Sequence, residues 1–250
     1  MRELKDRIIV ALDLDDLDKA IELVSKLVPE GVQIFKVGSQ LFTAYGPEAV
    51  RRVAEKGARV FLDLKFHDIP NTVYSAVATG TASGMLITTT SPAREAGDVE
   101  DSIVPGVFMM TVHTKGGLEM LKAAAKAAQA KARELKITKP FIVGVTRLTS
   151  DKDSGNIQDE VLQASQLARE AGLDGVVCAV SEAAAVRKEF GKDFIIVTPG
   201  IRAKGATTHD QSRIATALEA VKAGADYFVV GRPILEADDP LAALKGILTS

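Results

Sequence analysis

The sequence of 250 residues predicts an α/β fold, a single (β/α)8 TIM barrel, from three observations. Short runs of β-branched and aliphatic residues alternate with longer amphipathic stretches, which is typical of a parallel sheet covered by helices. There are eight such runs, and eight strand–helix repeats favour closure into a barrel over an open doubly wound sheet. The dinucleotide-binding pattern GxGxxG does not follow the first run, which disfavours the open sheet further.

The expected strands are the eight apolar runs, at Arg7–Asp13, Ile34–Gly38, Arg59–Phe66, Val107–His113, Phe141–Leu148, Gly175–Val180, Phe194–Gly200 and Tyr227–Ile234. The expected helices are the amphipathic stretches between them, at Asp16–Val28, Pro47–Lys56, Leu118–Leu135, Gln158–Ala171, Glu182–Phe190, Gln211–Ala223 and Pro240–Leu248. Proline at a helix start and glycine at helix ends are consistent with these boundaries.

Residues 84–106 fit this repeat poorly. Met85–Thr90 could itself be a strand, which would give nine candidates for eight places. We assign the fourth barrel strand to Val107–His113 and treat 84–106 as an insertion, longer than the usual short connection. Residues 1–250 then form one domain. A connection from a helix to a strand lies on the N-terminal face of a barrel, so we expect a surface excursion or a contact between subunits there.

Composition limits the classes of partner. Hydrophobic residues make up 46% of the chain, enough for a sizeable core, and the formal net charge of −2 does not favour nucleic acid or an anionic membrane as a partner. A single cysteine, Cys178, excludes an intramolecular disulfide. The charged N-terminus leads directly into a strand, without a signal peptide or membrane-length apolar run. We expect a cytoplasmic protein that acts on a small molecule.

Charged residues gather where several strands end, which is where barrel enzymes build their sites. Asp13 ends the first strand, Lys36 lies in the second, Asp63 and Lys65 end the third, and Asp68 follows on its loop. Alternation along a strand puts Asp63 and Lys65 on one face. Burying charges there is costly without a function. The alternative is a set of strand-end salt bridges. Taken together, these five residues predict two cations and three anions at one mouth of the barrel.

Two later loops pair glycine with arginine, in Pro199-Gly200-Ile201-Arg202 and Gly231-Arg232-Pro233. Barrels often bind phosphate at the loops after strands seven and eight, where glycine lets backbone N–H groups approach and arginine offers a fork of donors. The alternative for either loop alone is a turn glycine beside a solvated arginine. The polar segment 203–211 is a candidate lid. His67 and His113 lack the spacing of a metal site, and we expect no metal.

The stretch Asp63-Leu64-Lys65-Phe66-His67-Asp68-Ile69-Pro70-Asn71-Thr72 resembles the orotidine 5′-monophosphate decarboxylase family. The resemblance covers nearly the whole chain. Its supporting motifs are Val10-Ala11-Leu12-Asp13, Phe35-Lys36-Val37-Gly38, Val112-His113-x-x-Gly116-Gly117, Leu148-Thr149-Ser150, Pro199-Gly200-Ile201-Arg202 and Gly231-Arg232-Pro233-Ile234. DxKxxD alone is shared with related sugar-phosphate barrels, so the later motifs make the resemblance specific. Segment 84–106 departs from the family pattern.

The resemblance implies decarboxylation of orotidine 5′-monophosphate to uridine 5′-monophosphate, in de novo pyrimidine synthesis, without a cofactor. It implies that Lys65 protonates the C6 carbanion beside Asp63, and that Asp68 enters from the neighbouring subunit of a homodimer. The remaining matches are a network or ribose position for Asp13 and Lys36, a ribose contact for Thr72, a ring contact for Thr149, and the phosphate end for Arg202, Gln211, Gly231 and Arg232.

Two other functions fit a barrel of this kind. The first is a Mg²⁺-dependent sugar-phosphate decarboxylase or aldolase, whose metal site, as the resemblance implies, has an acidic residue at the position of Lys36. A lysine there would repel a divalent cation. The second is a non-catalytic barrel that senses a nucleotide. The intact set of Asp63, Lys65 and Asp68 disfavours a sensor.

Overall fold

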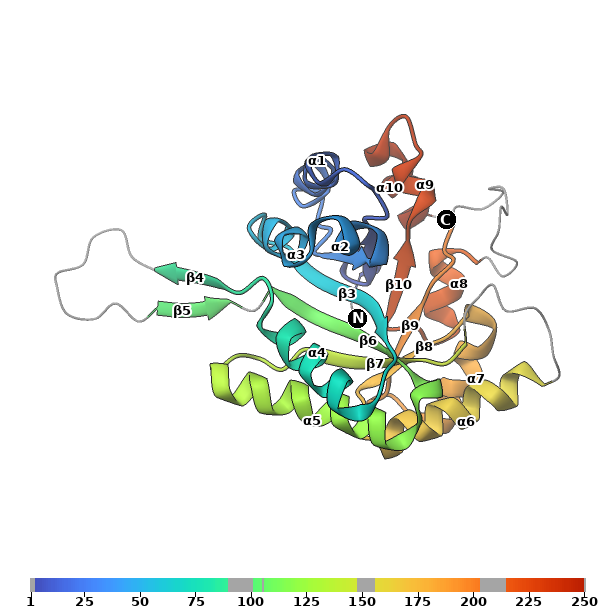
Figure 1. Cartoon of the computed structure of the whole chain (residues 1–250). Coiled ribbons are helices and arrows are strands. Elements are labelled where there is room, and N and C mark those ends of the chain that lie inside the picture. The colour runs from blue at the N-terminus through green and yellow to red at the C-terminus, as the bar shows by residue number, and fades with distance from the viewer. Residues whose placement is uncertain (1–2, 90–100, 105, 148–155, 203–214, 250) are drawn as a thin grey trace.

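A closed barrel of eight parallel strands forms the centre of the computed structural model, which describes residues 3–89, 101–104, 106–147, 156–202 and 215–249 (Figure 1). The strand order is β1-β10-β9-β8-β7-β6-β3-β2. The strands are β1 (Ile8–Ala11), β2 (Ile34–Gly38), β3 (Arg59–Phe66), β6 (Val107–His113), β7 (Phe141–Val145), β8 (Gly175–Val177), β9 (Ile195–Thr198) and β10 (Tyr227–Val230). The predicted fold class is confirmed.

Alternation along the strands divides the core into two layers. Residues such as Ile9, Phe61 and Val143 pack together inside the barrel, in a cluster that contains strand residues only. Their neighbours Val10 and Leu62 point outward and join the apolar faces of the helices. Both faces of each strand are therefore buried, which is why the strands read as continuous apolar runs.

Helices cover the outside of the barrel (Figure 1). They are α1 (Leu17–Leu27), α2 (Ser39–Tyr45), α3 (Pro47–Ala54), α4 (Pro70–Ala82), α5 (Gly117–Leu135), α6 (Ile157–Glu170), α7 (Val180–Phe190), α8 (Ala217–Lys222), α9 (Arg232–Leu235) and α10 (Pro240–Thr249). All seven expected helices have a counterpart, although the first residues expected for α8 lie outside the described part of the chain. At α1 the Asp16 carboxylate accepts a hydrogen bond from the Lys19 amide at 3.1 Å, a standard N-cap.

Five predicted strands were too long, those that became β1, β7, β8, β9 and β10. Three helices, α2, α4 and α9, were not predicted. Residues up to Val180 and Ile234 were expected to be extended, but β8 ends at Val177 and β10 ends at Val230. Helices α7 and α9 begin soon after these strands end. At α9 the proline suits a first helical turn. Helix α4 is rich in valine, threonine and glycine, which are weak helix formers. Its packing on the barrel stabilises it instead.

The segment that fitted the repeat poorly contains a strand that does not belong to the barrel. Strand β4 (Leu86–Thr89) pairs antiparallel with β5 (Asp101–Val104) in a separate two-stranded ribbon, which extends away from the barrel (Figure 1). The two ends of the segment meet, since a Cβ on Gly106 would lie 2.2 Å from the carbonyl oxygen of Gly84. The assignment of the fourth barrel strand to Val107–His113 is confirmed.

The barrel closes between its first and last strands. Strands β1 and β10 pair in parallel, with Ile8 opposite Phe228 and Val10 opposite Val230. Asp13 follows β1 and Arg232 follows β10, so both residues leave the sheet at the same edge.

In the described part of the chain, no helix is long and apolar enough to cross a membrane.

Candidate active site

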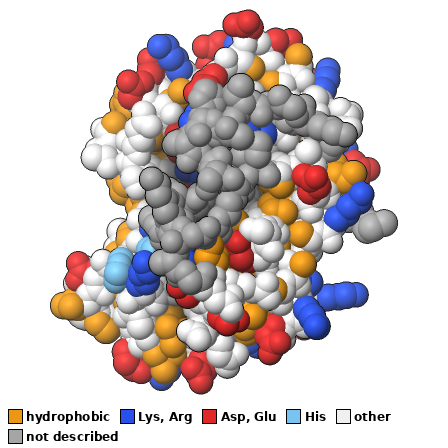
Figure 2. Space-filling model, turned by 90° about the vertical axis from the view of Figure 1, so that its right-hand side faces the viewer, with side chains coloured by type: hydrophobic (Ala, Val, Ile, Leu, Met, Phe, Trp, Pro, Cys, Tyr) orange, Lys and Arg blue, Asp and Glu red, His pale blue; other side chains and the backbone are white. Residues whose placement is uncertain are grey.

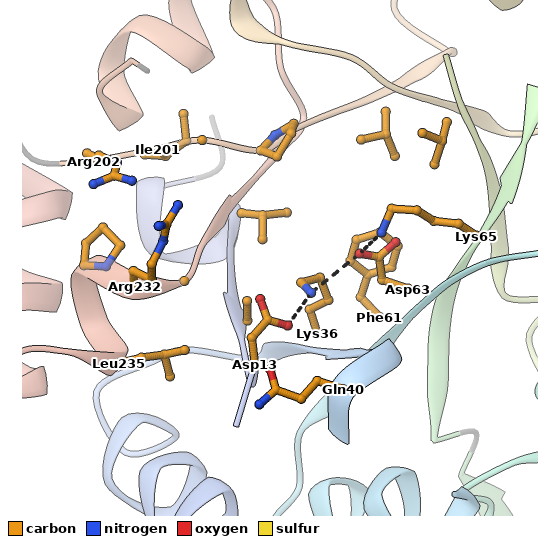
Figure 3. Close-up of a pocket in the computed structure, with 18 of the residues that line it drawn as sticks. Asp13, Lys36, Gln40, Phe61, Asp63, Lys65, Ile201, Arg202, Arg232 and Leu235 are labelled. Atoms are coloured by element: carbon orange, nitrogen blue, oxygen red, sulfur yellow. Dashed lines mark hydrogen bonds and ion pairs between the residues drawn. The ribbon is translucent and has the colours of Figure 1, made fainter. Parts of the chain in front are cut away.

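A cavity of about 720 Å³ opens at the carboxyl ends of the barrel strands, within the size range of small-molecule sites (Figure 3). Part of its wall is apolar, with contributions from Ala11, Phe61, Val145, Val177, Cys178 and Val229. Burial raises the pKa of the Cys178 thiol, and Glu182 adds to this effect while Arg187 opposes it. The cysteine is therefore a neutral wall residue and not a nucleophile.

Four charged side chains form a continuous network on one side of the cavity. Lys36 Nζ donates to Asp13 Oδ1 at 2.8 Å and lies 3.5 Å from Asp63 Oδ2. Lys65 Nζ donates to the same Asp63 oxygen at 2.8 Å. The dashed lines in Figure 3 trace this path from Asp13 to Lys65. Acid and base alternate along it, so each lysine has a carboxylate neighbour.

Asp63 is the most enclosed acid of the network, with 8% of its surface exposed. Burial acts to raise its pKa, but the charges of Lys36 and Lys65 and hydrogen bonds from Lys65 and Thr111 outweigh burial. The net pKa of Asp63 lies below its ordinary value. The carboxylate is therefore ionised near neutral pH, and it can hold a lysine ammonium at a fixed place.

Two arginines lie on another side of the same cavity, apart from Lys65 (Figure 3). Arg202 follows β9 and is 5% exposed, and its amide donates to the Ala215 carbonyl at 3.0 Å. Arg232 is the first residue of α9 and follows Gly231. Such a pair of guanidinium groups beside glycine backbone suits a phosphate group. The cavity therefore has an anion-binding end and a charge-network end.

The outer surface around this end of the molecule carries both signs of charge. Figure 2 shows acidic and basic side chains interspersed over the described part of that face. The described part of this face therefore does not show the single-sign stripe that nucleic acids select.

Comparisons with known proteins agree with this geometry. The model of the family "Orotidine 5'-phosphate decarboxylase / HUMPS family" matches residues 6–247. The chain belongs to this family. An orotidine 5′-phosphate decarboxylase of Moorella thermoacetica is 44% identical to it, over 97% of this chain and 91% of that protein. One from Vibrio vulnificus strain YJ016 is 41% identical, over 98% and 97%.

A solved orotidine 5′-phosphate decarboxylase, that of Lactobacillus acidophilus, has the same fold. It aligns with a TM-score of 0.75 and 32% identity, over 97% of each chain. The resemblance found in the sequence is confirmed, as is the enzyme class, a carbon–carbon lyase that works in pyrimidine synthesis.

Most of the site residues expected from this family are brought together. Those that line the cavity are Asp13, Lys36, Asp63, Lys65, Arg202, Gly231 and Arg232. Thr149, Gln211 and the candidate lid at 203–211 lie outside the described residues.

Two of the described site residues do not line the cavity. Asp68 and Thr72 are exposed, and Asp68 Oδ1 accepts a hydrogen bond from the neighbouring Ile69 amide at 2.6 Å. The expectation of five charges at one mouth is therefore wrong for a single chain, where four of them meet. Asp68 is separated because it follows the end of β3 on a loop that leads to α4.

Sequence patterns did not identify several residues of the site. Gln40, Arg147 and Glu236 also line the cavity, and Thr111 donates to Asp63 Oδ1 at 3.0 Å. Thr111 is a β-branched residue in a strand, where such residues are common, so the sequence does not distinguish it as a site residue. Gly38 was noticed only as part of a motif. A Cβ there would lie 2.8 Å from Lys36 Nζ and 3.0 Å from Asp13 Oδ1, so only glycine leaves room for this ion pair.

The histidine and acidic side chains of this region do not form a metal-binding cluster in the described part of the chain. Among the residues that the structure describes, no group of three or more histidine, cysteine, aspartate or glutamate side chains is placed to hold a metal ion. His67 and His113 stack on each other instead, with ring centroids 5.5 Å apart.

Proposed function

We propose that the protein decarboxylates orotidine 5′-monophosphate to uridine 5′-monophosphate, and that Lys65 is the catalytic acid. The observation that carries this proposal is the position of Lys65 Nζ, 2.8 Å from the buried Asp63 carboxylate in a cavity that also contains Arg202 and Arg232. A nucleotide carries its phosphate and its reacting ring at separate points. A cavity with two polar ends suits that substrate.

The chemistry requires stabilisation of a carbanion. The bond between C6 and the carboxylate breaks, carbon dioxide leaves, and the electron pair stays on C6. The Lys65 ammonium stabilises this charge and gives C6 a proton, and the lysine then recovers a proton from solvent. Asp63 holds the ammonium in place and lies near the departing carboxylate. No electron leaves the system, so the reaction needs no redox cofactor.

The other polar residues of the cavity bind the parts of the substrate that do not react. Arg202, Gly231 and Arg232 take the phosphate, and Asp13 and Lys36 take the ribose. The family resemblance adds Gln211 for the phosphate and Thr149 for the ring, two residues outside the described part of the chain. Binding energy from these remote contacts can orient the ring against Lys65, so they contribute to rate as well as affinity.

The proposal includes a homodimer in which Asp68 and Thr72 complete the site of the partner chain. Its support is their exposure outside the cavity of their own chain, next to Ile69, an apolar side chain that is 66% exposed. A partner would cover that side chain. Residues 1–250 then act as one domain with an insertion at 84–106, and the proposed location is the cytoplasm.

A direct assay tests the proposal against its nearest rival. Purified protein is incubated with orotidine 5′-monophosphate in the presence of EDTA. The decrease in the ultraviolet absorbance of the substrate is followed. We expect full turnover, because Lys36 stands where a metal-dependent relative would carry an acid. Turnover that strictly requires Mg²⁺ would identify the metal-dependent class. Binding of uridine 5′-monophosphate without turnover would identify a nucleotide sensor.

A further inference from the structure

Strand β3 leaves the regular ladder at the point where it carries Asp63 and Lys65. Leu62 pairs with Met110, and the next pair is Phe66 with Val112. Three residues of β3 therefore lie opposite a single residue of β6, Thr111. Such a bulge redirects the side chains near it and is common beside active sites.

Lys65 has an unusual backbone at this bulge, with a φ of 50°. Residues with a Cβ seldom adopt this left-handed region, and they do so at functional sites when their surroundings impose it. Lys136 is the other described non-glycine residue with a positive φ, and it ends helix α5, where the conformation is common. No helix end explains Lys65.

The hydroxyl group of Thr111 contacts both sides of the bulge. Its Oγ1 accepts a hydrogen bond from the Lys65 amide at 2.8 Å and donates one to Asp63 Oδ1 at 3.0 Å. Thr111 is fully buried. A hydroxyl has one proton to give, so these two contacts fix its orientation. The Lys65 amide therefore has a side-chain hydroxyl as its acceptor at this bulge.

We infer that Thr111 is a positioning residue for the catalytic lysine. It holds the Lys65 backbone in the left-handed conformation and fixes one Asp63 oxygen, while the other Asp63 oxygen holds Lys65 Nζ. The lysine is therefore located at both ends, by its amide and by its ammonium. The inference deepens the proposed function and rests on it, since it concerns the placement of the proposed proton donor.

The test compares Thr111→Val, which removes the hydroxyl and keeps the shape, with Thr111→Ser, which keeps the hydroxyl. Thr81→Val is the matched control, because Thr81 is also fully buried and its hydroxyl donates to the Val77 carbonyl within α4, away from the charge network. We expect Thr111→Val to lower kcat roughly tenfold to hundredfold, with KM within about threefold of wild type. Thr111→Ser and Thr81→Val should stay within about threefold in kcat.

Equal kcat for Thr111→Val and wild type would overturn the inference, and so would a loss that Thr111→Ser does not rescue. If Thr111→Val does not fold, Thr111→Ala removes the same hydroxyl and takes its place. A crystal structure of the variant separates this inference from the proposed function. Should wild type not turn over the nucleotide, the proposed function fails, yet a Lys65 φ that becomes negative still supports the positioning role. A φ that stays near 50° would refute it.

Discussion

Lys65 Nζ lies 2.8 Å from Asp63 Oδ2, although the backbone leaves the regular strand between these two residues. Strict alternation would place both side chains on one face, and both do line the cavity. Both side chains therefore still face the cavity, although the Lys65 backbone has a left-handed conformation. The ion pair therefore depends on the backbone as well as on the two side chains.

The first prediction concerns the proton donor. Lys65→Ala should lower turnover by about 10²–10⁴-fold or more, because a positioned acid contributes on that order. Binding of uridine 5′-monophosphate, measured by calorimetry, should persist because Arg202 and Arg232 are unchanged. The exposed Lys56→Ala is the control and should behave as wild type. Near-normal turnover of Lys65→Ala would refute the assignment.

The second prediction tests the shared site. Lys65→Ala and Asp68→Ala should each be inactive alone, while a mixture of the two should regain activity. A mixed dimer has one site with both residues intact, so about a quarter of wild-type activity is the upper limit for random pairing of two equal populations. Subunit exchange is verified with differently tagged chains. No recovery after verified exchange would show that Asp68 acts within its own chain or not at all.

A third prediction assigns the phosphate end by changing protein and substrate together. Arg232→Ala should reduce kcat/KM for orotidine 5′-monophosphate by roughly tenfold to hundredfold, the cost of one charge-assisted hydrogen bond. With orotidine, which lacks the phosphate, the same substitution should have little effect. An equal loss with both substrates would mean that Arg232 does not act through the phosphate.

Gly38 provides a fourth prediction. Its backbone, with φ −95° and ψ −176°, is open to any residue, so alanine causes no backbone strain. A Cβ there would nevertheless displace Lys36 Nζ from Asp13. Gly38→Ala should therefore lower kcat/KM about tenfold or more with little change in Tm, since only the tip of a flexible side chain must move.

Gly246→Ala is the control for that variant, because a Cβ at this position in α10 has no neighbour within 4 Å. It should leave activity unchanged and should stabilise the helix slightly. If both variants keep wild-type kcat/KM, the Lys36–Asp13 ion pair does not matter for the reaction.

The fifth prediction is a pH dependence of stability. The pKa of Asp63 is lower in the folded protein than in the unfolded chain, so its ionised form stabilises the fold. That contribution is complete above the unfolded value of about 3.9 and is lost as the pH falls through the folded value. The free energy of unfolding of wild type and of Asp63→Asn, from urea titrations, should differ by a constant amount above about pH 5. The difference should shrink below pH 4, and an unchanged difference at pH 3 would contradict the shift.

Much of the barrel could be predicted because each strand must bury both faces. Continuous apolar runs therefore marked all eight strands, and the spacing of Asp63 and Lys65 located the charged end of the cavity. Helix α4 was missed because its residues favour strands and only its packing makes it helical. The bulge at Lys65 and the contact with Thr111 depend on which strand lies beside β3, and a single sequence does not state this pairing.

The pairing of β1 with β10 also helps to set the distance between Asp13 and Arg232. Asp13 and Arg232 lie two or three residues beyond Val10 and Val230, which stand opposite each other where the barrel closes. A slip of one residue in this pairing would move one end of the cavity relative to the other by about 3.3 Å. A shift of that size would change the separation of the groups that one nucleotide has to contact. The register at which the barrel closes is therefore one determinant of where these polar groups stand, although the strand residues that set it are apolar.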